Sequence, residues 1–269
     1  MKVIVITGAS EGIGAELARQ IAARDKGRAA VVLAARRQGA LDAVAQEMRG
    51  MGTHVEVIVT DVTDRAACRH LIDETVARLG RIDVLINNAG MSAHANFSDT
   101  GDDDLAWYET LMVVNYWSVV WLTRAALPHL LATKGLVVGV SSLAGLVGVP
   151  GRTAYCSTKF AMNGFLEALR AELGHKGLRV MLAYPGTIDT AIRKQGFALG
   201  GKAPGVSMLK DDKAMPVATC ARLILNGMDR GQREVLMTPK ARFGRWLRLF
   251  APGMVDRLAM KEIKDEFRP

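Results

Sequence analysis

The N-terminal segment constrains the fold of this chain more than any other part of it. A β-branched run from Lys2 to Ile6 leads into TGASEGIG, and an amphipathic helical pattern follows over residues 15–24. A strand, a glycine turn and a helix in this order predict a dinucleotide site. Gly8 permits the tight turn, Gly12 lets the backbone approach a pyrophosphate, and Gly14 allows close packing of the helix, whose N-terminal amides meet the phosphates. On its own the pattern also fits a plain strand-to-helix turn.

The same alternation of strand and helix continues along the chain. Apolar or β-branched runs predict strands, and amphipathic patterns between them predict helices. The strands are expected at residues 2–6, 29–35, 54–60, 82–86, 136–140, 179–183 and 234–237, with helices at 15–24, 40–50, 65–79, 111–132 and 215–227. This order predicts an α/β fold with a doubly wound, Rossmann-type parallel sheet, in which ligands lie beyond the carboxyl ends of the strands. We expect a single domain over residues 1–239, with a C-terminal helical extension over residues 240–269.

The end of the second predicted strand bears on the choice of cofactor. Arg36 and Arg37 follow Ala35 about twenty residues after the glycine turn, where the residue that reads the adenosine ribose is expected. Two guanidinium groups suit a 2′-phosphate, whereas a carboxylate would suit a free 2′-hydroxyl. The sequence therefore favours NADP(H), with NAD(H) as the alternative because Glu11 brings a negative charge close to the same position. A solvated arginine pair at the start of a helix would look the same.

The stretch from Ser141 to Lys159 carries the chemistry. Ser141 and Ser142 stand where a buried strand ends, and Tyr155 and Lys159 are four residues apart, which places a phenol and an ammonium on one helical face. A phenol with a pKa near 10 is a poor acid or base at neutral pH, and we expect the ammonium to lower that pKa. Tyr155 is then predicted to exchange a proton and Ser142 to hold the reacting oxygen. Asn115, inside an apolar helix, is expected to anchor a water that links Lys159 to solvent.

Five motifs stand in the order typical of one family. They are TGASEGIG, Asp61-Val62, the NNAG sequence that begins at Asn87, Ser142 with the YxxxK motif of Tyr155 and Lys159, and Pro185-Gly186. Over residues 3–190 the chain resembles a short-chain dehydrogenase/reductase of the single-domain type. The resemblance implies a catalytic tetrad of Asn115, Ser142, Tyr155 and Lys159. It also implies cofactor contacts at Gly8, Ser10, Gly12, Ile13, Gly14, Arg36, Arg37, Asp61, Val62, Asn87, Ala89, Gly90, Tyr155, Lys159, Pro185, Gly186, Ile188 and Thr190.

The same resemblance implies an activity and an assembly. The expected protein is an oxidoreductase that interconverts a carbonyl and a secondary alcohol on a small or lipid-like hydrophobic substrate, as a homodimer or homotetramer. Glu11 departs from the basic residue often found at its position in NADP-dependent members. Three alternatives are a catalytically silent NADP(H)-binding regulatory module, an NAD-dependent alcohol dehydrogenase, and a lyase or epimerase. The intact Ser142, Tyr155 and Lys159 disfavour the first, and the lack of a larger C-terminal domain disfavours the last.

Composition excludes several other classes of protein. The chain has 269 residues, 49% of them hydrophobic, so it can bury a sizeable core, yet no segment has the roughly 18 uninterrupted apolar residues of a membrane span. The three cysteines and five histidines show neither disulfide nor metal-ligand spacing, so we expect no metal and a cytoplasmic protein. The net charge of +8 comes without a base-reading motif or a long basic run, so nucleic-acid binding is not expected.

Two C-terminal regions are expected to set the choice of substrate. Residues from about 190 to 213 are rich in Gly and Lys and only weakly periodic, which predicts a lid over the pocket. An amphipathic helix that ends at Pro252-Gly253 follows, with aromatic and apolar residues on one arc and arginines opposite, formed by Phe243, Trp246, Leu247, Phe250, Arg242, Arg245 and Arg248. Such a stretch over 242–250 either makes peripheral contact with the inner face of a membrane or packs on its own or a partner subunit.

Overall fold

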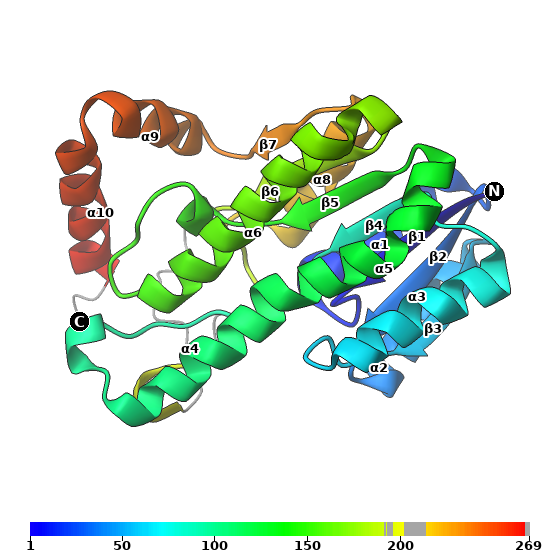
Figure 1. Ribbon diagram of the computed structural model, residues 1–269, viewed down its shortest axis with the longest axis horizontal. Helices are drawn as coiled ribbons and strands as arrows, with labels where there is room; N and C mark the ends of the chain where they lie inside the picture. The colour runs from blue at the N-terminus through cyan, green and yellow to red at the C-terminus, as the bar shows by residue number, and fades with distance from the viewer. Residues whose placement is uncertain (191, 193–195, 202–213, 267–269) are drawn as a thin grey trace.

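A sheet of seven parallel strands forms the centre of the molecule (Figure 1), in a computed structural model that describes residues 1–190, 192, 196–201 and 214–266. The strand order is β3-β2-β1-β4-β5-β6-β7, and every neighbouring pair is parallel. The strands are β1 (Lys2–Thr7), β2 (Ala29–Ala35), β3 (His54–Val59), β4 (Val84–Asn87), β5 (Leu136–Val140), β6 (Arg179–Tyr184) and β7 (Glu234–Leu236). The chain reverses its winding direction between β1 and β4, which confirms the predicted doubly wound α/β fold.

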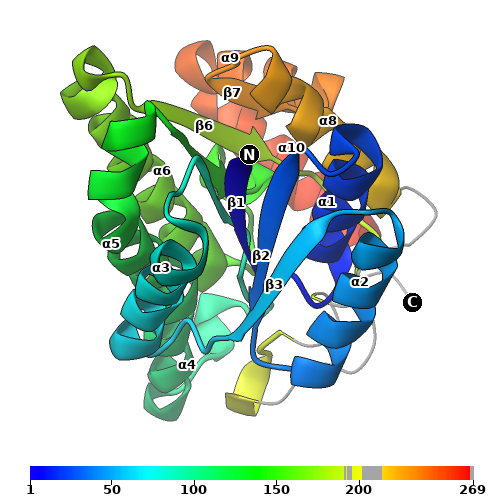
Figure 2. The same cartoon turned by 90° about the vertical axis from the view of Figure 1, so that its right-hand side faces the viewer.

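Helices cover both faces of this sheet (Figure 2). One face carries α1, α2 and α8, and the other carries α3, α5 and α6. The bounds are α1 (Gly12–Asp25), α2 (Gln38–Gly50), α3 (Arg65–Leu79), α5 (Ser118–Thr133), α6 (Thr153–Leu173) and α8 (Val217–Asp229). Each face holds its own apolar core, and the strands between them are buried on both sides. This is why β2 and β5 are nearly continuous apolar runs without an alternating pattern.

The helical segment predicted over residues 111–132 is interrupted. Helix α4 (Leu105–Met112) passes into a π-helical turn, Val113–Trp117, and then into α5. A π-helical turn adds one residue to the helical repeat and commonly marks a functional site. Here it contains Asn115, whose side chain is fully buried.

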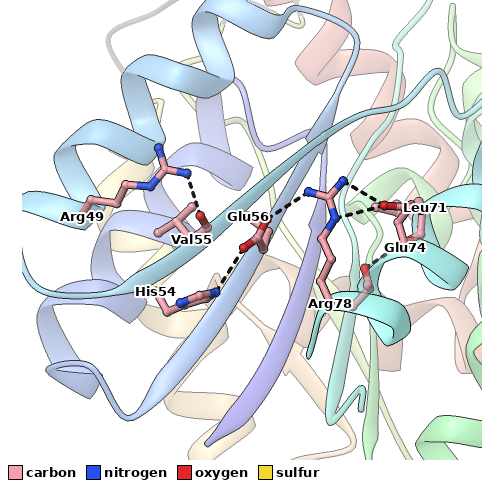
Figure 3. A network of polar contacts seen from close by, with 8 residues as sticks. Arg49, His54, Val55, Glu56, Leu71, Glu74 and Arg78 are labelled. Carbon is pink, nitrogen blue, oxygen red and sulfur yellow. Dashed lines mark hydrogen bonds and ion pairs between the residues drawn. The ribbon is translucent and has the colours of Figure 1, made fainter. Parts of the chain in front are cut away.

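Charged residues on the edge strand β3 join it to its neighbours (Figure 3). Arg78 on α3 donates to Glu56 of β3 at 3.0 Å and to Glu74 at 2.8 Å, while His54 lies 3.2 Å from the second oxygen of Glu56. Arg49 at the end of α2 donates to the main chain of β3. Because these groups are largely solvated, such contacts stabilise the fold only slightly. We therefore interpret this cluster as structural.

The C-terminal region lies beyond the carboxyl ends of the strands, where α9 (Pro239–Phe250) and α10 (Pro252–Glu266) follow one another (Figure 1). The prediction that the helical pattern stops before Pro252-Gly253 is confirmed, since α9 ends at Phe250. The second helix was not predicted; α10 begins at Pro252, because proline is well tolerated at the first position of a helix. Most of the predicted lid over 190–213 falls outside the described residues. Among the described helices, none combines the length and the apolar character that a membrane span requires.

Candidate active site

A cavity of about 1550 Å³ opens at the carboxyl ends of the strands, between the glycine turn, the start of α6 and the α9–α10 pair. Most of the predicted site residues line it: Gly8, Ser10, Gly12, Ile13, Arg36, Arg37, Asp61, Val62, Ala89, Gly90, Ser142, Tyr155, Lys159, Pro185, Gly186, Ile188 and Thr190. Gly14, Asn87 and Asn115 do not line it and lie behind its wall. Residues that lie far apart in the sequence thus line one cavity.

The glycine turn has the backbone shape that a dinucleotide requires. Gly8 and Gly12 have φ angles of +64° and +56°, which favour glycine. A Cβ atom on Gly14 would lie 2.2 Å from the carbonyl oxygen of Gly8, so only glycine lets α1 pack this closely on β1. The N-cap residue of α1, Glu11, makes no side-chain capping bond, which leaves the first amides of the helix to an anion in the cavity. This cradle fits the pyrophosphate of a nicotinamide dinucleotide.

The two asparagines after β4 differ in their contacts. Asn88 donates from Nδ2 to the carbonyl oxygens of Thr7 at 3.0 Å and Gly8 at 3.2 Å, so it fixes the glycine turn from behind. Asn87 is buried, and neither polar atom of its amide has a hydrogen-bond partner within the described residues. Burying an unsatisfied amide is costly, but Asn87 does not line the cavity, so its predicted contact with the cofactor stays a prediction.

The two arginines after β2 have different neighbours. Arg37 pairs with Glu11 of the glycine turn, with 2.8 Å between Nη2 and Oε2. Arg36 lies near Asp61, whose carboxylate accepts from the N–H and the hydroxyl of Thr63. Burial acts to raise the pKa of Asp61, but those hydrogen bonds and the charge of Arg36 outweigh burial and hold the pKa below its usual value. The sequence placed Glu11 near the arginines, and the structure identifies which arginine it pairs with.

Ser142, Tyr155 and Lys159 come together where β5 ends and α6 begins. Ser142 caps a 3₁₀ turn, Leu143–Gly145, by accepting from the N–H of Ala144 at 3.2 Å. Lys159 donates from Nζ to the carbonyl oxygen of Val140 at 3.0 Å, and Nζ lies 5.7 Å from the centroid of the Tyr155 ring. All three side chains are mostly buried and line the cavity, so a carbonyl group placed there would meet a hydroxyl, a phenol and an ammonium.

Burial dominates the proton affinities at this position. It raises the pKa of the Tyr155 phenol, although the charge of Arg152 and a hydrogen bond with Ser142 each act to lower it. Burial also lowers the pKa of the Lys159 ammonium to about 8. The prediction that Lys159 brings the pKa of Tyr155 below its usual value is therefore wrong for the protein without a bound cofactor. Tyr155 is protonated near neutral pH, which is the form that gives a proton to a carbonyl oxygen.

Asn115 holds three segments of the site together. Its Oδ1 accepts from the N–H of Met91 at 2.8 Å, and its Nδ2 donates to the carbonyl oxygen of Met91 at 2.9 Å and to the hydroxyl of Thr158 at 3.0 Å. A Cβ atom on Gly90 would lie 3.1 Å from Oδ1 and 3.7 Å from Nζ of Lys159, so the amide and the ammonium flank this glycine. We interpret Asn115 as a positioning residue; its predicted role as a water anchor stays a prediction.

Comparison with known proteins adds the family. The model of the short chain dehydrogenase family matches residues 2–198, which is well over half of the chain. The chain belongs to the short-chain dehydrogenase family. It is an oxidoreductase of the kind that acts on CH–OH and C=O groups, and the family predicted from the ordered motifs is confirmed.

Relatives of this short-chain dehydrogenase are similar over nearly its whole length. It is 34% identical to 11-beta-hydroxysteroid dehydrogenase A of Sesamum indicum over 95% of this chain and 73% of that protein. It is 35% identical to 11-beta-hydroxysteroid dehydrogenase-like 4A of Arabidopsis thaliana over 94% of this chain and 82% of that protein. A short-chain dehydrogenase from Sphingobium yanoikuyae, solved in complex with NADPH, superimposes with a TM-score of 0.77 at 28% identity, over 95% of this chain and 96% of the other.

Sequence reasoning about this short-chain dehydrogenase missed two groups that line the cavity. Arg152 precedes Tyr155 by three residues, a spacing that places both on one face at the start of α6 and could have identified it. His94, after β4, carries no local pattern that would have singled it out. Helix α10 also contributes Val255 and Leu258 to the wall, and no signal for that packing was visible after Pro252.

Proposed function

We propose that the protein is an NADP(H)-dependent oxidoreductase that interconverts a carbonyl and a secondary alcohol on a hydrophobic substrate, with Tyr155 as the acid/base. The observation that carries this proposal is that one and the same cavity is lined by the glycine turn and by Ser142, Tyr155 and Lys159. The lining of this cavity is largely apolar and includes Leu143, Leu146, Val147, Val149, Phe197 and Leu247. An apolar wall next to a few polar groups is what recognition of a hydrophobic ketone or alcohol requires.

The chain's own residues would divide the work of reduction. The glycine turn, Asp61 and the segment from Pro185 to Thr190 would hold the dinucleotide, and the nicotinamide would supply the hydride. Ser142 would donate to the carbonyl oxygen of the substrate. As the substrate carbon accepts the hydride, the O–H bond of Tyr155 breaks and its proton bonds to that oxygen. Lys159 would stabilise the phenolate that remains until solvent returns a proton.

The test is oxidation of NADPH by the purified protein with a panel of ketones of increasing apolar size. We expect turnover that improves with apolar size, because larger ketones bury more of the apolar wall. A catalytically silent module would bind NADPH without consuming it. A lyase or epimerase would convert its substrate with no net oxidation of the nucleotide. Either result would overturn the proposal.

We propose that Arg36 is the main reader of the 2′-phosphate and that Glu11 withholds Arg37 from it. Replacing Arg36 by alanine should weaken NADPH binding by about 10- to 100-fold, since a charged hydrogen bond contributes roughly 1.5–3 kcal/mol. NADH binding should change little. The Glu11→Gln variant should bind NADPH about tenfold more tightly, because its ion pair with Arg37 is removed. Quenching of protein fluorescence by each nucleotide measures these affinities.

A matched control is Arg28→Ala, which removes an exposed arginine at the amino end of β2. This variant should bind both nucleotides as the wild type does. If Arg36→Ala weakens NADH and NADPH equally, the arginine supports the fold of the site without reading the phosphate. An NAD-dependent dehydrogenase, the alternative that the Glu11–Arg37 pair favours, would then be the better description.

We further propose that the outer surface of α9 makes peripheral contact with an anionic membrane, at the inner face of which the protein resides as a cytoplasmic enzyme. Two of the predicted basic residues face the protein body: Arg245 pairs with Glu234, and Arg248 donates to the carbonyl oxygen of Leu146. Phe243, Trp246 and Phe250 have 63%, 65% and 80% of their surface exposed, although Phe243 also borders the cavity. The exposed Arg242 beside them would complement anionic lipid.

A second exposed aromatic surface supports the predicted homodimer or homotetramer. Trp117 stacks on Trp121 with 6.2 Å between ring centroids, and Tyr116 meets Phe165 of α6 edge-on. Trp117 itself is 44% exposed on the outer side of this cluster. Because aromatic side chains are enriched at the core of protein interfaces, we assign subunit contact to this surface rather than to α9.

One experiment separates these two surfaces. In one variant, Phe243, Trp246 and Phe250 are all changed to serine. Its affinity for phosphatidylserine vesicles, measured by co-sedimentation, should fall by about tenfold or more. The molecular mass of its oligomer, measured by light scattering, should not change. Trp117→Ser should lower the mass and leave vesicle binding in place. Phe97→Ser, at an exposed phenylalanine elsewhere, is the control. If the oligomer of the triple variant dissociates and the wild type does not bind vesicles, α9 is a subunit contact.

A further inference from the structure

Two cations lie close to the Tyr155 ring, and the proposed mechanism uses only one of them. Nζ of Lys159 is 5.7 Å from the ring centroid, and Cζ of Arg152 is 5.6 Å from it. Both side chains line the cavity. Arg152 is the N-cap residue of α6, one helical turn before Tyr155. The two cations thus lie at nearly the same distance from the centre of the ring.

The position of Arg152 is fixed from outside its own helix. Its Nε donates to Nε2 of His94 at 2.7 Å. His94 is 9% exposed, and its backbone N–H donates to the carbonyl oxygen of Phe197 at 2.9 Å. The next residue, Ala95, donates to the carbonyl oxygen of Gly151 at 2.9 Å. The segment after β4 thus ties itself to the chain just before α6 and holds the guanidinium beside the phenol.

The contact between Arg152 and His94 also sets the state of the imidazole. A guanidinium has only donors, so Nε2 of His94 must be the acceptor and the ring must be neutral with its proton on Nδ1. His94 acts as a support that positions a permanent cation.

We propose that Arg152, held by His94, is a second positioning cation for the Tyr155 phenol, and that together with Lys159 it favours the charged form of that phenol. Within the described part of the chain, the other titratable groups near Tyr155 are Cys156 and Lys159 on α6 and His94 after β4, together with the hydroxyl of Ser142 after β5. Burial raises the pKa of the Cys156 thiol, so this group stays neutral. Among the described residues, the charge of Arg152 acts to lower the pKa of the Tyr155 phenol, and Nζ of Lys159 lies at a similar distance from the ring.

A fixed cation at this distance has a defined effect on proton transfer. An opposite charge within about 4–6 Å typically lowers the pKa of an acid by roughly 1–3 units, and Arg152 does act to lower the pKa of Tyr155 against the effect of burial. Removing this charge should therefore reduce the fraction of phenolate about tenfold at a given pH, which is one unit of pKa. The inference rests on the proposed function in one respect only, namely that Tyr155 is the group that transfers the proton.

The test titrates Tyr155 directly and needs no substrate. The chain has four tyrosines, so the full-length protein containing 3-fluorotyrosine gives few fluorine resonances, and the Tyr155→Phe variant assigns the one required. Fluorine makes the phenol more acidic and brings its titration closer to the pH range in which the fold is stable. We expect Arg152→Gln to raise the midpoint of the Tyr155 resonance by about one unit and Arg152→Lys to restore most of it.

Two variants of His94 test the support. His94→Gln keeps an acceptor for Arg152 and should leave the midpoint close to that of the wild type. His94→Leu removes the acceptor and should shift the midpoint in the same direction as Arg152→Gln. Tyr116, whose ring lies against Trp117 and Phe165, is the internal reference and should not move in any variant.

The outcomes are distinct from those that test the function. A Tyr155 midpoint that is unchanged in both Arg152→Gln and His94→Leu would overturn the inference, even if the enzyme reduces ketones. A shift of the midpoint in a protein that turns over no ketone would support the inference and count against the proposed function. If Arg152→Gln does not fold, the Tyr155 midpoints of Arg152→Lys and His94→Leu are compared instead. Arg152→Lys keeps a positive charge beside the phenol, whereas His94→Leu removes the acceptor that holds the guanidinium there. Only the second variant should then raise the midpoint.

Discussion

Replacing Tyr155 by phenylalanine should lower the turnover of NADPH with ketones by about 10²- to 10⁴-fold, the usual contribution of a positioned acid. The variant lacks only the phenolic oxygen, so the ring still fills its place against Ala144 and Cys156 in the small apolar cluster at the start of α6. We expect unchanged NADPH affinity and unchanged thermal stability. Initial rates, together with a fluorescence titration of NADPH, measure both effects on the same preparation.

The matched control is Tyr184→Phe. Tyr184 is fully buried in β6, and its hydroxyl has no hydrogen-bond partner among the described residues. Removing an unsatisfied buried hydroxyl should leave turnover intact and stabilise the fold slightly. If Tyr155→Phe retains wild-type turnover, the proton comes from another group and the proposed mechanism fails. If it loses turnover because NADPH no longer binds, the phenol serves the cofactor instead.

The sheet was accessible from the sequence because its strands are buried on both faces. β2 and β5 were predicted with their observed bounds, since short, uninterrupted apolar runs between helical patterns are typical of buried parallel strands. The start of β4 was placed two residues early. Asp83 accepts from the N–H of Val3 at 2.8 Å through its side chain, so the ladder with β1 begins only at Val84. When a side chain takes the place of a backbone acceptor in the ladder, the hydrophobic pattern of the sequence does not show it, so the start of the strand could not be predicted.

The polar groups of the site were accessible for a different reason. Ser142, Tyr155 and Lys159 are polar residues in apolar surroundings, so their types and spacing pointed to chemistry before any contact was known. Their proton affinities could not be inferred, because the pKa of Tyr155 depends on how deeply the fold buries it. The support from His94 was also hidden, since it depends on a loop after β4 meeting the start of α6. Spacing identifies groups on one element, whereas contacts between elements need the fold.

Gly14→Ala should damage both the fold and the cofactor site. The new methyl group would lie 2.2 Å from the carbonyl oxygen of Gly8 and 2.6 Å from Nδ2 of Asn88, and one of these is backbone that cannot rotate away. Overpacking of this kind typically costs 1–3 kcal/mol, and we expect about 3 kcal/mol here. For a chain of this size that lowers the melting temperature by roughly 6–12 °C. Because Gly8 and Gly12 form the cradle, NADPH affinity should fall by about tenfold or more.

The comparison variant is Gly50→Ala, at the exposed end of α2, where a Cβ atom would meet nothing within 4 Å. It should stabilise the protein by about 0.5–1 kcal/mol, because alanine loses less conformational freedom than glycine on entering a helix. Thermal unfolding with and without NADPH measures both effects. A Gly14→Ala protein as stable as Gly50→Ala would mean that α1 can move away from β1 at no cost. If it also bound NADPH normally, the close approach of Gly14 to Gly8 would not be what shapes the pyrophosphate cradle.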